Sequence, residues 1–198
     1  AAAMGIYGND YRDRLPVASA SMANTWWDVG QGQERSNSAN LFLLPKLNYT
    51  ALKDLACAGN PDAATQMTDP AATDWRNLDE VSYSYYLMFA NDRPVASSHE
   101  PLVILADRSP VVRRAVRGQV IFPLENSPNH GGCGQCVLRT DGSVLWLQSP
   151  MVDGDNIWLP GWIEDVLRQA EAMSRSGRWE PLQGNELPAS ATDVFLGP

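Results

Sequence analysis

Residues 135–148, Gln-Cys-Val-Leu-Arg-Thr-Asp-Gly-Ser-Val-Leu-Trp-Leu-Gln, contain two short apolar runs separated by a turn sequence. The runs 135–139 and 144–148 have the length and composition of β-strands. The Asp141-Gly142 pair between them is typical of a tight type I′ turn, because both central residues of that turn need a positive φ. The stretch therefore predicts an antiparallel β-hairpin.

Three segments nearer the N-terminus also have strand patterns. Tyrosines alternate with serines in 81–89, and short apolar runs occupy 102–105 and 120–122. Asp107 follows the second of these runs and is expected to form an Asx turn where that strand ends. Together with the hairpin, these segments predict an antiparallel sheet.

Helical patterns flank these strands. Residues 1–14 are predicted to be the end of an N-terminal helix that Pro16 closes. Shorter helices are expected at 40–47 and 50–55, the second capped by Thr50.

The region after residue 160 is predicted to add a helix and a tail. Residues 161–175 have apolar side chains on one helical face, and 177–198, with three prolines, are expected to lie extended over the surface. We predict one α+β domain over residues 1–198, in which 161–198 form a C-terminal extension.

Charge and hydropathy exclude two classes of protein. The 198 residues carry a net charge of −8, which repels a phosphate backbone, and the only basic cluster comprises Arg113, Arg114 and Arg117. Nucleic-acid binding is therefore not expected. The longest apolar runs, 85–90 and 102–106, are too short to cross a bilayer.

The cysteines allow several chemistries. His130, Cys133 and Cys136 form an H-x2-C-x2-C pattern, and Cys57 is available as a fourth zinc ligand. A zinc-dependent or thiol-dependent enzyme could be built on this pattern. The C-x2-C pair runs into a strand rather than opening a helix, which disfavours a redox motif. A structural disulfide between Cys133 and Cys136, or a set of buried thiols, is the commoner outcome.

A second candidate site is the acidic loop Asp153-Gly-Asp-Asn. Asp153, Asp155 and Asn156 offer oxygen ligands at the short spacing that suits calcium. A plain acidic turn explains the same residues. His99 lies in a polar loop and is expected to be a solvated histidine.

The tryptophans suggest an alternative function. Trp26, Trp27 and Trp75 are expected on exposed loops, where they could bind a glycan or a protein in a secreted binding module. Three other tryptophans are expected to pack in the core or beneath the C-terminal helix: Trp146, Trp158 and Trp162.

Residues 126–144, Asn-Ser-Pro-Asn-His-Gly-Gly-Cys-Gly-Gln-Cys-Val-Leu-Arg-Thr-Asp-Gly-Ser-Val, resemble the signature of the prepilin-type H-x9-DG proteins. These are pseudopilin-like proteins related to type II secretion and type IV pilus subunits. Ten residues lie between His130 and Asp141-Gly142 here, where the family has nine. Other segments similar to the family are 4–16, 55–62, 82–85, 105–110 and 155–158.

The resemblance implies a pilin-like fold, in which the end of a long N-terminal helix packs on an antiparallel sheet. It implies a non-catalytic assembly subunit of a pseudopilus or pilus, with other pilin-like subunits and a prepilin peptidase as partners. Membrane contact is expected only through an apolar N-terminal half that is missing from this chain. The full-length protein is accordingly expected to be anchored in the inner membrane and extracytoplasmic.

The resemblance also assigns roles to individual residues. His130 is expected to hydrogen-bond near the Asp141-Gly142 turn, and Asn126 and Asp107 are further motif positions. No cofactor other than calcium is implied.

Overall fold

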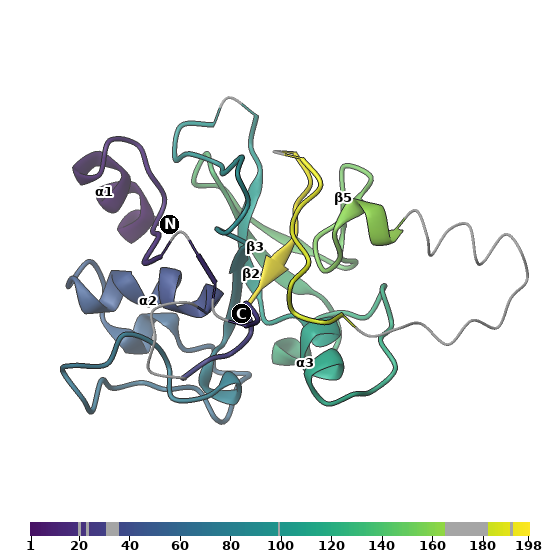
Figure 1. Ribbon diagram of the computed structural model, residues 1–198, viewed down its shortest axis with the longest axis horizontal. Coiled ribbons are helices and arrows are strands. Elements are labelled where there is room, and N and C mark those ends of the chain that lie inside the picture. The colour runs from purple at the N-terminus through teal and green to yellow at the C-terminus, as the bar shows by residue number, and fades with distance from the viewer. Residues whose placement is uncertain (20, 23, 31–35, 99, 165–181, 191) are drawn as a thin grey trace, which may run out of the picture.

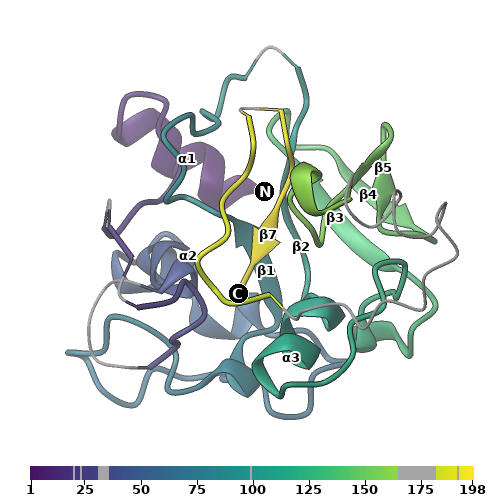
Figure 2. The same cartoon turned by 45° about the vertical axis from the view of Figure 1, so that its right-hand side comes forward.

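The protein is an α+β domain built on a five-stranded antiparallel sheet in the order β4-β3-β2-β1-β7 (Figures 1 and 2). The predicted α+β class is thereby confirmed. This computed structural model describes residues 1–19, 21–22, 24–30, 36–98, 100–164, 182–190 and 192–198. The strands of the sheet are β1 (Tyr83–Tyr86), β2 (Val103–Asp107), β3 (Gln135–Arg139), β4 (Val144–Leu147) and β7 (Leu196–Gly197).

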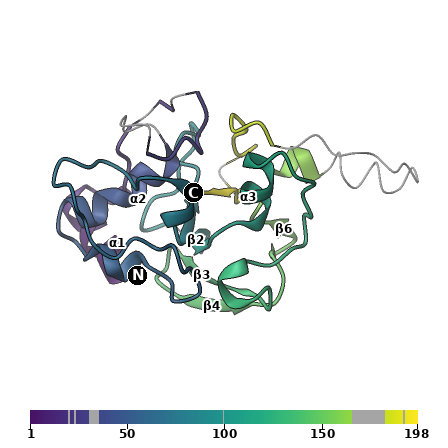
Figure 3. The same ribbon diagram turned by 90° about the horizontal axis from the view of Figure 1, so that it is seen from below.

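Helices cover both faces of the sheet. The helices α1 (Ala2–Asp10) and α2 (Asn37–Lys46) lie on one side, and α3 (Pro110–Val116) lies on the other (Figures 1 and 3). The small hairpin of β5 (Met151–Val152) and β6 (Asp155–Asn156) is on the side of α3. Among the described residues, no helix is long and apolar enough to cross a membrane.

Short 3-10 helices connect these elements: η1 (Leu52–Leu55), η2 (Leu78–Glu80) and η3 (Pro128–His130). The helix predicted at 50–55 is η1, whose N-cap is Ala51 rather than Thr50. The helix predicted at 40–47 begins earlier, because the Ser36 side chain accepts a hydrogen bond from the Ala39 N–H and caps it.

The predicted N-terminal helix is shorter than expected. It ends at Asp10 rather than at residue 14. Arg12 and Asp13 both have positive φ, 56° and 66°, and this left-handed conformation cannot continue an α-helix. Pro16 therefore lies beyond the end of the helix.

The predicted hairpin is confirmed, but its turn type is different. The Gly142 N–H donates to the Arg139 carbonyl at 3.0 Å, and the Arg139 N–H donates to the Ser143 carbonyl at 3.0 Å. Only Gly142 in this loop has a positive φ, 82°. This is a three-residue loop, Thr140 to Gly142, in which a turn is followed by a left-handed glycine, and the type I′ prediction was wrong.

Two predictions about the sheet were also wrong. Residues 120–122 are not a strand; the Val120 and Phe122 side chains are half exposed, and the Arg114 guanidinium lies over the Phe122 ring. The end of the expected surface tail is instead the edge strand β7, which pairs with β1, and Phe195 and Leu196 are fully buried.

The C-terminal helix predicted at 161–175 falls partly outside the described residues. Residues 161–164 are helical, and the rest of the predicted helix lies beyond what the structure describes.

The turn glycine provides a test of the hairpin. A Cβ at Gly142 or at Gly5 meets nothing within 4 Å, but only Gly142 has a left-handed φ. Gly142→Ala is therefore expected to lower the free energy of unfolding by about 1 kcal/mol, and Gly142→Val by more. The matched control Gly5→Ala lies in α1 and is expected to raise it by about 0.5 kcal/mol. Urea denaturation measures both, and equal effects would contradict the turn assignment.

Candidate functional site

Three potential ligand side chains from distant parts of the chain meet at one end of β2. They are Cys57, Asp107 and His130, and one ligand atom from each lies within 4.8 Å of the others. Asp107 is the last residue of β2, His130 ends η3, and Cys57 follows η1. We call this set the Cys–Asp–His cluster. It is the one such group among the residues that the structure describes.

Asp107 is the buried centre of the cluster, with 1% of its surface exposed. Its Oδ2 accepts a hydrogen bond from the Cys136 N–H at 2.7 Å, and its Oδ1 accepts one from Asn129 Nδ2 at 3.0 Å. His130 Nε2 lies 3.0 Å from Oδ2. The expected Asx turn is absent, because the nearby Ser109 N–H donates to Ser84 Oγ and the carboxylate bonds to distant residues instead.

A second set of contacts holds the loop that follows Cys57. Asn60 Nδ2 donates to Ser82 Oγ at 3.1 Å, and Asn60 Oδ1 accepts from Arg108 Nη1 at 2.8 Å. Gly59 lies so close to Asn129 that a Cβ there would be 1.5 Å from the Asn129 carbonyl oxygen. Only glycine allows this approach, which brings the Cys57 loop against the His130 loop.

The cluster is open to solvent on the side of His130. The His130 side chain is 36% exposed and makes an edge contact with Trp146, with ring centroids 5.2 Å apart. Burial, followed by the charges of Cys57, Asp107 and Cys136, raises the pKa of the adjacent Tyr83 to about 12. Burial, then Asp107 and Cys57, also raises the pKa of the Cys136 thiol. Cys136 is therefore held as a thiol, which makes it a weak nucleophile near neutral pH.

The structure brings together a different set from the H-x2-C-x2-C pattern. All three cysteines are described and all are free thiols, so the predicted Cys133–Cys136 disulfide is not formed. Cys133 is exposed and lies outside the Cys–Asp–His cluster. Sequence reasoning missed Asp107 as a partner of His130. The available signal was an acidic residue directly after an apolar strand.

His130 and the turn pair do not meet. His130 lies just before β3, and Asp141-Gly142 follows the other end of that strand. The predicted hydrogen bond of His130 near the turn was wrong, because a five-residue extended strand separates the two. Asn126 has a structural role, since its Nδ2 donates to the carbonyls of Gly132 at 3.2 Å and Gln148 at 2.9 Å.

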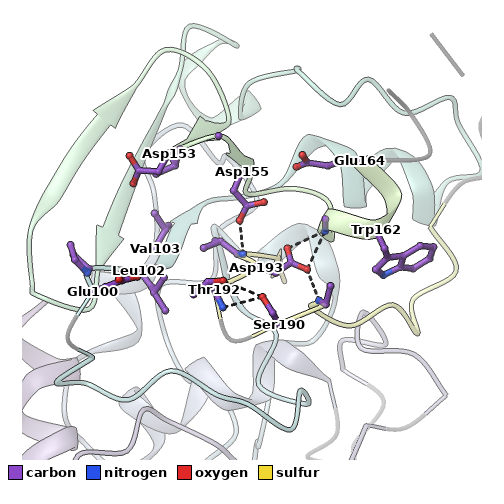
Figure 4. A pocket seen from close by; sticks show the side chains of 16 residues that line it. Glu100, Leu102, Val103, Asp153, Asp155, Trp162, Glu164, Ser190, Thr192 and Asp193 are labelled. Atoms are coloured by element: carbon purple, nitrogen blue, oxygen red, sulfur yellow. Dashed lines mark hydrogen bonds between the residues drawn. The ribbon is translucent and has the colours of Figure 1, made fainter. Parts of the chain in front are cut away.

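The predicted calcium loop lines a cavity of about 830 Å³ (Figure 4). Asp153 and Asp155 line this cavity, but Asn156 turns away, donating to the Pro123 carbonyl and accepting from the Trp158 N–H. Asp153 is exposed and pairs with Arg139 at 3.3 Å. The three predicted ligands therefore do not converge, and calcium binding stays a prediction.

The carboxylates of this cavity hold the C-terminal segment instead. Asp155 Oδ2 accepts from the Val194 N–H at 2.7 Å, and Asp193 accepts from the Gly161 N–H at 3.0 Å and from the Ala189 N–H (Figure 4). Burial, together with the neighbouring Asp193 and Glu164, raises the pKa of Asp155 to about 6.

The tryptophan prediction was largely wrong. Trp26 and Trp75, expected on exposed loops, are buried in the core, and Trp27 is half-buried against Trp26. Trp158 is buried as predicted, whereas Trp146 and Trp162 are about half exposed, at 48% and 50%. The surface proposed for glycan binding is therefore not formed by those residues. His99 lies outside the described residues.

The fold and the cluster define an α+β protein with a cysteine, an aspartate and a histidine gathered at one end of its sheet. Comparison with family models, with curated proteins and with solved structures found no match to this chain.

Asp107→Asn tests whether the buried carboxylate holds the loops together. An amide group at this position turns an N–H donor toward the Cys136 N–H or toward the Asn129 amide. We therefore expect the free energy of unfolding to fall by about 2–4 kcal/mol. The control is Asp141→Asn, because Asp141 is exposed and its side chain accepts hydrogen bonds from Ser143. Urea denaturation at pH 7 measures both variants, and a loss below about 1 kcal/mol for Asp107→Asn would remove its central role.

The raised pKa of Asp155 predicts that the stability of the fold depends on pH. Its pKa is raised from 3.8 to about 6 in the folded chain, so the folded state binds more protons than the unfolded state between these values. Stability from this group is complete below pH 3.8 and is lost as the pH rises through about 6. Asp155→Asn keeps an acceptor for the Val194 N–H and should raise the Tm at pH 7 but not at pH 3.5. An equal rise at both pH values would contradict this linkage.

Proposed function

We propose that this chain is the globular domain of a pilin-like assembly subunit. The observation that carries the proposal is the apolar start of the exposed face of α1, whose polar residues Asn9 and Asp10 stand only at its C-terminal end. Met4, Tyr7 and Gly8 are buried, whereas Ala2, Gly5 and Ile6, like the terminal Asn9 and Asp10, are exposed, Ile6 to 52%. An apolar stretch on a helix surface is normally covered by another element. The exposed face therefore favours packing against the helices of neighbouring subunits.

The position of α1 on the sheet supports the same proposal. The beginning of the helix lies over β2 and β3, because Ala1 and Met4 line a cavity of about 320 Å³ together with Ile104, Leu138 and the turn residues 140–142. Tyr7 packs edge-on against Tyr49, which follows α2, at a centroid separation of 5.3 Å. An N-terminal helix that begins beside one face of an antiparallel sheet is compatible with the arrangement that the resemblance to H-x9-DG proteins implies.

Four of the six segments that carry the resemblance also contribute residues that lie close together in space. Cys57, Asn60, Ser82 and Asp107 come from three of these segments, and His130 comes from the fourth. Their hydrogen bonds join loops to strands, which is a structural role that suits a non-catalytic subunit. In this proposal the partners are other pilin-like subunits, and a prepilin peptidase processes the full-length protein at the inner membrane.

Cell fractionation tests the proposal directly. An antibody raised against this chain is expected to detect the native gene product in the inner-membrane fraction and in material sheared from the cell surface. Deletion of the prepilin peptidase should increase the mass of the product and remove the sheared pool. A product of unchanged mass that stays in the soluble fraction of both strains would overturn the proposal.

A matched pair of substitutions tests the exposed face of α1. Ile6→Asp places a charge on that face, and Val120→Asp places one on an equally exposed valine beyond α3, at 53%. We expect Ile6→Asp to reduce the sheared pool at least about tenfold, the effect of roughly 1.4 kcal/mol on subunit packing. Val120→Asp should leave the pool unchanged, and both purified variants should keep the wild-type Tm. Equal effects on the pool would show that α1 is not the packing surface.

A further inference from the structure

We propose that the Cys–Asp–His cluster is a binding site for one borderline-soft divalent cation, of which Zn²⁺ is the representative. The ligands are Cys57 Sγ, a carboxylate oxygen of Asp107 and a ring nitrogen of His130. This site does not depend on the pilin-like function, because neither α1 nor the hairpin turn takes part in it.

The triangular arrangement distinguishes a cation site from a catalytic relay. In a nucleophile–histidine–carboxylate relay, the nucleophile and the carboxylate contact different nitrogens of the imidazole, so the ring holds them apart. Here the sulfur, the carboxylate oxygen and the ring nitrogen all lie within 4.8 Å of one another. His130 Nε2 and Asp107 Oδ2 are 3.0 Å apart. Two ligands of one tetrahedral zinc ion are separated by a similar distance, about 3.4 Å.

The donor set selects the type of ion. A thiolate with an imidazole is suited to zinc and to neighbouring transition metals, whereas calcium and magnesium prefer sites made of oxygen alone. Three protein ligands leave the fourth tetrahedral position for water or for an external ligand. The partly exposed His130 places that position on the open side of the cluster.

Charge balance also favours a cation. Asp107 is buried, and His130 is the one basic side chain within ion-pair distance of it among the described residues. Buried charges are normally paired or bound to a metal. A divalent ion bound by the Cys57 thiolate and the Asp107 carboxylate makes the site neutral.

The ligands are held in place without the ion. Backbone and amide donors fix both oxygens of Asp107, and the Gly59 N–H lies 3.4 Å from Cys57 Sγ, as a donor to that sulfur. The contact of Gly59 with Asn129 sets the separation between the cysteine and histidine loops. Binding therefore requires little rearrangement, and outer contacts of this kind strengthen metal sites.

Cobalt titration of the reduced, chelator-treated chain tests the site. Co²⁺ is expected to bind in a 1:1 ratio, with thiolate-to-cobalt charge-transfer absorption that Zn²⁺ abolishes. Cys57→Ser should remove this absorption, and His130→Gln should weaken binding at least about tenfold. The matched control Cys133→Ser changes an exposed cysteine and should bind as the wild type does. Zn²⁺ should raise the Tm of the wild type and of Cys133→Ser but not of Cys57→Ser.

Three outcomes would overturn the proposal. The first is absence of cobalt binding by the reduced wild-type chain. The second is binding that persists in Cys57→Ser but is lost in Cys133→Ser, which would place the ion on the exposed C-x2-C segment. The third is a bound ion without thiolate absorption. Far-ultraviolet circular dichroism of each metal-free variant shows that the fold is retained. His130→Gln, at a partly exposed position, keeps the test valid if Cys57→Ser does not fold.

Discussion

The arrangement of the loops at one end of the sheet depends on the buried carboxylate of Asp107. Its two oxygens accept hydrogen bonds from Cys136 and Asn129 and lie beside His130, which joins the end of β2 to η3 and to the start of β3. A buried charge is tolerated only where such partners surround it. Asp107 belongs to β2, the middle strand of the sheet. The loops therefore cannot move away without exposing the carboxylate or breaking its hydrogen bonds.

The other end of the chain is fixed by a similar use of acidic groups. Asp155 and Asp193 accept backbone N–H groups from the segments 189–194 and 161, and this places Phe195 in the core beside Trp26. The strand β7 then pairs with β1 and completes the sheet. Acidic side chains at this end of the chain therefore act as acceptors for backbone N–H groups of the loops.

The sequence predicted what depends on local pattern and missed what depends on distant contacts. The α+β class, β2 and the hairpin followed from apolar runs and from one Asp-Gly pair. The turn type was wrong, because strand register determines whether two or three residues form the loop. The strand β7 has two residues, too few for any periodicity. His130 and Cys57 were named together as potential zinc ligands, but Asp107, 23 positions before His130, was missed because no spacing rule connects the two.

The two proposals concern opposite ends of the sheet. The exposed face of α1 begins beside residues 140–142, at the hairpin turn, whereas the Cys–Asp–His cluster lies before the first residue of β3. An extended strand of five residues, about 16 Å long, separates them. A cation at the cluster would therefore stabilise the loops without touching the surface through which subunits pack. Assembly at one end and metal binding at the other are physically separable, since each depends on side chains that the other does not use.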